Sequence, residues 1–177
     1  MLNAKWYSRV AIKTAKITVK DATYTGKAIT QKITVKLGSK TLKAGVDYTI
    51  SYKNNKNVGK ATITITGIGA YKDSVVKTFK INPKSTKISK VTAGKKSLKV
   101  TVGKQTKEVT GYEIQYSTSK KFKSAKKVTI KKAKTTSATI KKLKAKKTYY
   151  VRVRTYKPVK GKKYNSGWSS CKKAKTK

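Results

Sequence analysis

The sequence of 177 residues has no histidine, one cysteine (Cys171), two phenylalanines and five acidic residues. Without histidine, neither a Ser-His or Cys-His catalytic pair nor an imidazole–metal site can form. A single cysteine excludes an internal disulfide and every cysteine-cluster metal site. No apolar run approaches the roughly 18 residues of a membrane-spanning helix. We therefore expect a protein that is not an enzyme, has no cofactor, binds no metal and has no transmembrane segment.

Lysine is the residue present in large excess. Lysine and arginine total 47 against five acids, which gives a net charge of +42, and only Arg9, Arg152 and Arg154 are arginine. Residues 1–84 hold 17 basic and three acidic residues, hence +14, whereas residues 85–177 hold 30 and two, hence +28. Paired lysines recur at the expected turns of this second half. Such a surface predicts attraction to anionic polymers that weakens as salt rises.

Nucleic acid is the competing partner for so basic a chain, because neutralising many phosphates gives tight binding at low salt. Proteins that read a base sequence concentrate arginine, asparagine and glutamine on one groove-facing element. Here arginine is rare and the lysines are spread around the predicted domains. Any nucleic-acid binding should therefore be nonspecific.

Apolar residues alternate with polar ones in short runs throughout the chain, which predicts β-strands separated by turns. In the first half the runs cover residues 16–20, 31–37, 48–52, 61–65 and 75–81. We expect a sandwich over residues 16–82, preceded by an N-terminal extension (1–15) and followed by a linker (83–87) that contains Pro83.

The second half contains seven such runs, the number of strands in an immunoglobulin-like sandwich. They cover residues 88–93, 97–102, 110–117, 127–131, 137–143, 148–156 and 168–175. The predicted fold class is therefore all-β, with two tandem immunoglobulin-like β-sandwiches, the second spanning residues 88–177.

Three segments of the second half resemble a fibronectin type III domain of the kind found in surface proteins of Firmicutes. They are residues 111–117 (GYEIQYS), residues 143–154 (LKAKKTYYVRVR), with Tyr149 at the position of the tyrosine corner, and residues 164–169 (YNSGWS). The second strand, 98–102, departs from the family because it lacks the tryptophan common in animal members.

The first half is similar to a bacterial immunoglobulin-like repeat that occurs in large clostridial surface proteins. The similarity lies in residues 24–27, 47–52 and 54–62. The two resemblances imply a Gram-positive cell-surface or secreted protein with a role in adhesion or cell-wall contact. We expect an extracellular or wall-associated monomer, and a fragment of a longer protein because residues 1–16 do not read as a signal peptide.

The few carboxylates give little support for catalysis or calcium binding. Glu108 is expected in a loop, while Glu113 should point outward and face Arg152 or Arg154 on the neighbouring strand. Asp47 is expected to shape the turn before its strand, and Asp21 and Asp73 are scattered among lysines, so the three do not predict a calcium site. Cys171 is expected to face the core as a small apolar residue.

One surface could bind a ligand in addition to stabilising the fold. The outward face of residues 148–156 carries Tyr150, Arg152, Arg154 and Tyr156, with Lys172 expected nearby. Aromatic rings beside guanidinium groups can stack on sugars or bases and bind phosphate or carboxylate. The alternative is an ordinary ladder of cross-strand pairs.

Two functional hypotheses follow for the whole chain. The first is a non-catalytic, lysine-rich structural or binding module that associates with anionic cell-wall polymers or glycans. The second is a protein-recognition or host-signalling module, in which the same surface contacts a host or bacterial surface protein.

Overall fold

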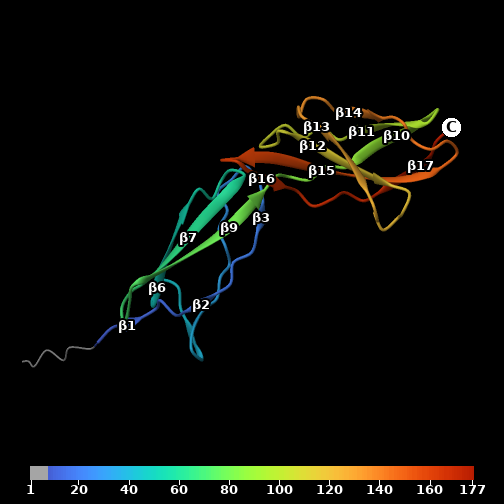
Figure 1. Cartoon of the computed structure of the whole chain (residues 1–177). Helices are drawn as coiled ribbons and strands as arrows, with labels where there is room; N and C mark the ends of the chain where they lie inside the picture. Colours follow the sequence, from blue (N-terminus) through green and yellow to red (C-terminus); the bar gives the residue numbers. More distant parts are fainter. Residues whose placement is uncertain (1–7) are drawn as a thin grey trace, which may run out of the picture. The chain divides into compact units, whose positions relative to one another are not determined.

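The computed structural model describes residues 8–177, which form an all-β chain without a helix (Figure 1). The chain divides into two compact units, Met1–Ile81 and Asn82–Lys177. The predicted all-β fold class is confirmed. Short strands form because β-branched residues and tyrosine alternate with lysine and threonine, so that one face of each strand can be buried.

In the first unit, the described residues from Ser8 onward form nine strands in three small sheets. The strands are β1 (Val10–Ala11), β2 (Lys16–Ile17), β3 (Ala22–Thr23), β4 (Val35–Leu37), β5 (Lys40–Leu42), β6 (Tyr48–Lys53), β7 (Gly59–Gly67), β8 (Tyr71–Lys72) and β9 (Ser74–Asn82). The main sheet has the order β3-β9-β7-β6, and the smaller ones are β2-β4-β5 and the parallel pair β1-β8. The long strand β7 alternates regularly and buries Ala61, Ile63 and Ile65.

The first unit begins earlier than we expected. Ile12 is fully buried and Ala15 is 6% exposed, both in the same core as Ile63 and Ile65. Strand β1 also pairs with β8. Residues 8–15 are therefore part of this unit and not an extension, because their apolar side chains complete its core; residues 1–7 of the expected extension lie outside the described residues.

The expected strand at residues 31–37 is shorter in the structure. Only Val35–Leu37 pairs as a strand. At Gln31 the backbone N–H donates to the hydroxyl of Tyr52 at 2.8 Å, and that hydroxyl donates to the Gln31 carbonyl at 3.3 Å. A side chain thus takes the place of a neighbouring strand, although the alternation of apolar residues continues.

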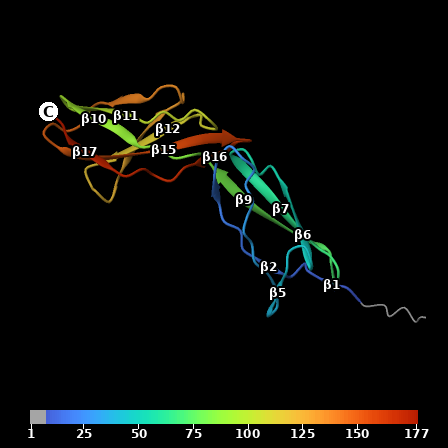
Figure 2. The ribbon, with the colours of Figure 1, turned by 180° about the vertical axis from the view of Figure 1, so that it is seen from behind.

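The second unit consists of two sheets that enclose one core (Figure 2). Its strands are β10 (Ile88–Gly94), β11 (Ser97–Val102), β12 (Gly111–Ser117), β13 (Lys126–Ile130), β14 (Ser137–Ile140), β15 (Thr148–Val159), β16 (Lys162–Asn165) and β17 (Lys172–Lys175). One sheet has the order β10-β11-β14. The other has the order β13-β12-β15-β16, and β17 also pairs with β15.

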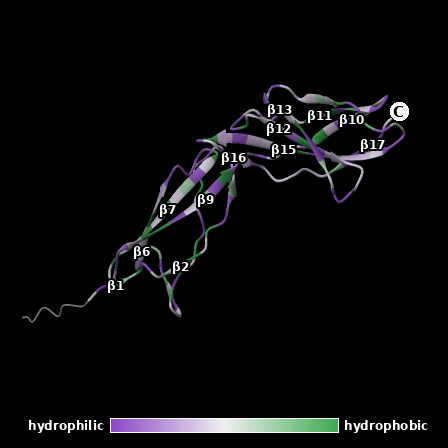
Figure 3. Ribbon diagram, viewed as in Figure 1, coloured by the Kyte–Doolittle hydropathy of each residue, from purple (hydrophilic) through white to green (hydrophobic). Residues whose placement is uncertain are grey.

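The core of the second unit comes from the inward residues of both sheets. Leu98 and Val100 from one sheet are fully buried, as are Ile114, Val151 and Val153 from the other. Hydrophilic residues gather in the turns between strands, where Figure 3 is largely purple. The seven predicted strands are all present, although their ends shift by several residues.

The hairpin of β15 and β16 was not predicted. Val159 pairs with Lys162 across a two-residue turn, in which Lys160 and Gly161 both have positive φ (48° and 75°). Two positive φ values match the tight turn that suits the twist of a hairpin. Pro158 lies within β15, and a proline, which has no N–H to donate, disguises such a strand in the sequence.

The expected linker is also more ordered than its composition indicates. Thr86 Oγ1 donates to the Gly103 carbonyl at 2.6 Å, and the Gly103 N–H donates to the Lys87 carbonyl at 2.9 Å. Thr155 Oγ1 donates to the Lys84 carbonyl at 2.8 Å. Residues 84–87 are thus attached to the second unit by hydrogen bonds.

Candidate binding surface

Strand β15 carries most of the residues that the sequence analysis selected. Tyr149, Val151 and Val153 face the core, so the intervening residues lie on the other face of the sheet. There the register pairs Ser117 with Tyr150, Gln115 with Arg152, Glu113 with Arg154 and Gly111 with Tyr156. The four β15 residues therefore share one face with four residues of β12, as predicted from alternation.

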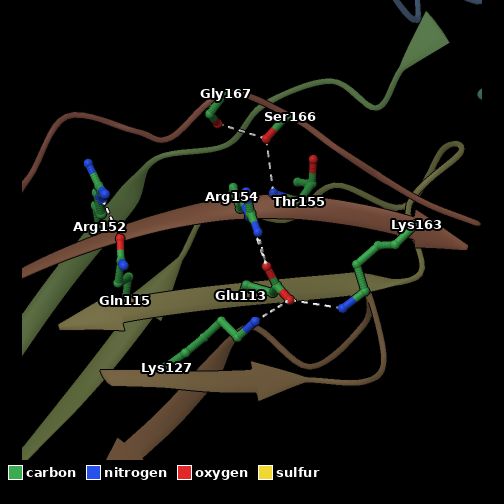
Figure 4. A network of polar contacts seen from close by, with 9 residues as sticks. All are labelled: Glu113, Gln115, Lys127, Arg152, Arg154, Thr155, Lys163, Ser166 and Gly167. Atoms are coloured by element: carbon green, nitrogen blue, oxygen red, sulfur yellow. Dashed lines mark hydrogen bonds and ion pairs between the residues drawn. The ribbon is translucent and has the colours of Figure 1, made fainter. Parts of the chain in front are cut away.

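Glu113 is the electrostatic centre of this face (Figure 4). Arg154 contacts Oε2 through Nε at 2.8 Å and through Nη2 at 2.6 Å. Lys127 Nζ and Lys163 Nζ lie 3.1 Å and 2.9 Å from Oε1. The Glu113 side chain is only 1% exposed, so three cations from β13, β15 and β16 cover a carboxylate that we expected to point into solvent. The expected partner across the sheet is confirmed as Arg154.

Two opposing effects act on the pKa of Glu113. Burial alone would raise it, because a charged group loses solvation. Hydrogen bonds from Lys163, Arg154 and Lys127, together with the charge of Arg154, outweigh burial and lower the pKa to about 2. Glu113 is therefore an ionised structural anion at neutral pH, and it cannot act as a general acid there.

The two arginines stack against aromatic rings that the sequence analysis did not select. The Arg152 guanidinium carbon lies 4.0 Å from the ring centre of Phe122 and 4.8 Å from that of Trp168. The Arg154 carbon lies 4.4 Å from the Trp168 centre. Arg152 Nε also donates to Gln115 Oε1 at 2.7 Å. Each guanidinium group is thus held by a side chain of β12 through polar contacts, and an aromatic ring packs against it.

Trp168 is positioned by serines that hydrogen-bond to the edge of β15. The Thr155 N–H donates to Ser166 Oγ, and the Val153 N–H donates to Ser169 Oγ, both at 3.0 Å. In return, the Ser166 and Ser169 N–H groups donate to the carbonyls of Thr155 and Val153. This segment accounts for the late start of β17, because its serine hydroxyls replace backbone carbonyls.

The side chain of Tyr156 is buried and is not open to a ligand. It is 6% exposed, and Lys163 Nζ lies 4.5 Å from its ring centre. Its ring lies over Gly111, where an added Cβ would approach a ring carbon to 3.0 Å and the Ile130 carbonyl oxygen to 2.0 Å. A glycine is therefore required at position 111 by the close approach of β13.

Lys172 is not brought to this face. It pairs with Val151, a core residue, and its Nζ donates to the Ser89 carbonyl at 2.9 Å. Lys173 is the residue that pairs with Tyr150. The structure therefore brings Tyr150, Arg152, Arg154 and Tyr156 together and adds Trp168, Phe122 and Gln115. A signal for Trp168 was present in the pattern Ser-Gly-Trp-Ser at 166–169.

The remaining expected residues can be placed individually. The hydroxyl of Tyr149 accepts the Lys144 N–H at 3.1 Å, which confirms the tyrosine corner. Asp47 Oδ2 accepts the Lys43 N–H at 2.7 Å, which confirms its role in a turn. The expectation for Cys171 was wrong, because Cys171 is exposed and precedes the shortened β17.

The other acids do not converge on a common site. Asp21 and Asp73 each lie 3.6 Å from one lysine, Lys80 and Lys13 respectively, and Glu108 Oε1 lies 2.6 Å from Lys157 Nζ. Within residues 8–177, no three His, Cys, Asp or Glu residues are placed so that they could share a metal ion. That same part of the chain holds no helix able to span a bilayer.

Three solved structures align with the chain at low sequence identity. A crystal structure of titin domains aligns with 92% of this chain at 16% identity and a TM-score of 0.39. The FN1–FN3 domains of chicken CNTN1 align with 96% at 14% identity and a TM-score of 0.44. A β-1,2-glucanase from Parabacteroides distasonis aligns with 66% at 13% identity and a TM-score of 0.44. The alignments span 66%, 68% and 17% of those chains, respectively.

The family comparison is more direct. No curated protein matches the chain. Residues 82–170, which are half of the chain, match the fibronectin type III domain. This span begins at Asn82, the first residue of the second unit, and includes the strands β10–β16. The chain therefore belongs to the fibronectin type III family.

Proposed function

We propose that this chain is a non-catalytic, extracellular or cell-wall-associated module that binds anionic polymers through its lysine-rich surface. The observation that carries the proposal is the position of the acids in the second unit. Glu113 is buried under three cations, and Glu108 is paired with Lys157 with its side chain 19% exposed. Residues 85–177 contain 30 basic residues against these two acids.

The consequence is a domain whose outward charge is almost entirely positive. Ion pairs consume Arg154, Lys127, Lys163 and Lys157, while the other cations of this unit form no ion pair among the described residues. Uncompensated lysines attract polyanions over a distance set by the Debye length, about 8 Å at physiological salt. Teichoic-acid-like polymers and acidic polysaccharides of a Gram-positive wall are the proposed partners, and the first unit is the proposed bacterial immunoglobulin-like repeat.

A salt series tests this function. The full chain is titrated with purified anionic wall polymer and, as the control, with a neutral wall glycan. We expect binding to the anionic polymer to weaken steadily as salt increases, and no binding to the neutral glycan. Equal affinity at low and high salt would contradict the electrostatic mechanism. Preference for an oligonucleotide of equal charge would instead favour the nucleic-acid alternative.

Protein recognition is the second candidate, and the stacked arginines favour it. Arg152 and Arg154 are half-buried and oriented by Trp168, Phe122 and the β12 side chains. Rigid guanidinium groups beside aromatic rings are typical of the residues that dominate protein interfaces. Tyr150 is half-buried on the same face, so Tyr150→Ala should weaken binding to a protein partner. Unchanged binding by Tyr150→Ala, with loss only after lysine neutralisation, would reject this candidate.

A further inference from the structure

A pocket of about 650 Å³ opens at one end of the second unit, and Ser117 and the tyrosine-corner residue Tyr149 are among the residues that line it. It lies where β12 and β14 end and β15 begins, between the loop of residues 118–125 and the loop of residues 141–147. Tyr116, Tyr149 and Leu143 contribute its apolar lining, and all three belong to or pack against the core. Six lysines also line it: Lys123, Lys126, Lys141, Lys142, Lys144 and Lys147.

The loop of residues 141–147 has its backbone held at several points. The Leu143 N–H donates to the Lys96 carbonyl at 3.0 Å, and the Lys144 N–H donates to the Tyr149 hydroxyl. The buried Thr176 donates through Oγ1 to the Lys144 carbonyl at 2.6 Å and accepts the Lys147 N–H at 3.1 Å. The lysines of this wall therefore project from a fixed backbone.

The opposite wall is also held by local bonds. Ser117 Oγ donates to the Lys123 carbonyl at 2.7 Å and accepts the Ser119 N–H at 3.0 Å. The Phe122 N–H donates to the Ser119 carbonyl at 2.9 Å, while its ring lies against Arg152. Because both walls are ordered before a ligand arrives, little backbone entropy is lost on binding.

The positive charge of the pocket is not neutralised by acidic side chains of the described residues. None of its six lysines forms an ion pair within residues 8–177, and the two acids of the unit are engaged by other cations. Six ammonium groups around one hollow repel each other, so a bound anion would relieve an unfavourable arrangement. No wall of the pocket contains an acid.

The residue types indicate which anion fits. All six cations are lysines, which act as flexible point charges, whereas arginine provides a planar fork that binds carboxylates and phosphates in a fixed bidentate geometry. Phosphate presents oxygens in several directions and can accept from ammonium groups on both walls. The Tyr116 hydroxyl has no hydrogen-bond partner among the described residues, and burial, together with nearby Tyr149, raises its pKa. It therefore stays protonated as a donor to a phosphate or to a hydroxyl of the backbone that carries it.

We propose that this pocket binds phosphate groups of a linear polymer with a polyhydroxylated backbone, and that it is the main anion site of the second unit. The proposal rests on the anion-binding function above and adds a location and a ligand class to it. Lysines spread over the rest of the surface then contribute general attraction, while the pocket contributes contacts at short range.

The test compares two triple variants of the full chain that carry the same net charge. K141Q/K144Q/K147Q removes three pocket lysines whose side chains are exposed, and leaves the backbone bonds in place. K131Q/K132Q/K134Q removes three exposed lysines in and beside the loop between β13 and β14, none of which lines the pocket. Binding of inorganic tripolyphosphate and of a short poly(glycerol phosphate) is measured by calorimetry over a salt series.

We expect the pocket variant to bind at least about tenfold more weakly and its salt dependence to lose a slope of about 2, as three lost phosphate contacts imply. The control variant should weaken by about twofold or less. Tyr116→Phe should weaken binding and leave the salt slope unchanged. Equal losses in both triple variants would overturn the pocket and leave the proposed function intact.

The remaining outcomes separate the two proposals further. If tripolyphosphate binds in a pocket-dependent way but the polymer does not bind, the proposed function and the polymer ligand both fail, and only the location of a phosphate site in the pocket stands. If neither probe binds the wild-type chain, both fail. Tighter binding of oligogalacturonate than of poly(glycerol phosphate) would overturn the phosphate assignment. Tighter binding of a single-stranded oligonucleotide would overturn the proposed polymer class.

Discussion

The two units of this chain use their acidic residues in different ways. In the first unit the paired acids are at the surface: the side chains of Asp21 and Asp73 are 48% and 34% exposed, and each lies 3.6 Å from one lysine. In the second unit Glu113 is 1% exposed and contacts three cations. Exposed pairs contribute little to stability, whereas a buried charge depends on its partners. The unit with more positive charge therefore depends more strongly on one carboxylate.

Removing the Glu113 carboxylate should give the largest difference in stability loss between the two units. Glu113→Ala should lower the free energy of unfolding of the second unit by about 4 kcal/mol, because Arg154 loses its partner inside a half-buried stack. Asp73→Ala, the matched change in the first unit, should cost about 0.5 kcal/mol or less. Denaturant unfolding with hydrogen exchange followed separately in each unit measures both effects. Similar losses in the two units would contradict the contrast.

Low pH should also destabilise the second unit. The pKa of Glu113 is about 2 in the folded chain against an ordinary 4.5, so the unfolded chain binds the proton more readily. Its contribution, up to about 3 kcal/mol, is complete above pH 4.5 and is lost as the pH falls toward 2. Unfolding measured from pH 7 to pH 2 should show this loss in the wild type. Glu113→Gln should remove this part of the pH dependence, and an unchanged profile in Glu113→Gln would contradict it.

Aromatic stacking gives a smaller difference. Trp168→Ala removes two arginine–ring contacts and should destabilise the second unit by about 2 kcal/mol. Among residues 8–81, the corresponding contact is exposed, with Lys40 Nζ at 5.3 Å from the Tyr71 ring centre, and Lys40→Ala should leave the stability of the first unit nearly unchanged. Thermal unfolding of both variants tests the difference. Trp168→Phe retains a ring and should recover part of the loss, unless the stacking has no role.

Salt should produce the smallest effect. Raising ionic strength from 0.01 M to 0.15 M shortens the Debye length from about 30 Å to about 8 Å and reduces lysine repulsion. The gain in stability should stay below about 1 kcal/mol and be larger in the second unit, where residues 85–177 carry +28 against +14 for residues 1–84. Hydrogen exchange of each unit at the two salt concentrations measures it. Equal gains would show that charge density does not distinguish the units.

Much of the second unit could be predicted because local alternation and tertiary structure agree there. Leu98, Val100, Ile114 and Val151 occupy the core positions that a period of two assigns to them. The partner of Glu113 also followed from the adjacency of two strands. Its burial did not, because the covering residues Lys127, Arg154 and Lys163 come from three different strands, and their convergence depends on the register of the sheet.

Strand ends were predicted less well where side-chain hydroxyl groups, and not the backbone of a neighbouring strand, form the hydrogen bonds. Tyr52 satisfies Gln31 in the first unit, and Ser166 and Ser169 satisfy β15 in the second. Neither arrangement changes the alternation of apolar residues, so strand ends were misplaced at both sites. The pocket was not predicted, because its lysines come from two segments, residues 118–126 and 141–147, that are distant in sequence. Only the fold shows that these two segments lie on either side of one pocket.

The serines beside β15 also bear on how the molecule avoids self-association. Between the parts of β15 that pair with β16 and with β17, Val153 and Thr155 have both backbone groups occupied by Ser169 and Ser166. A strand from another molecule would find no free donor or acceptor there, although an open stretch of this kind is where sheets of separate chains join. Two hydroxyl groups thus keep this stretch of sheet edge from templating aggregation.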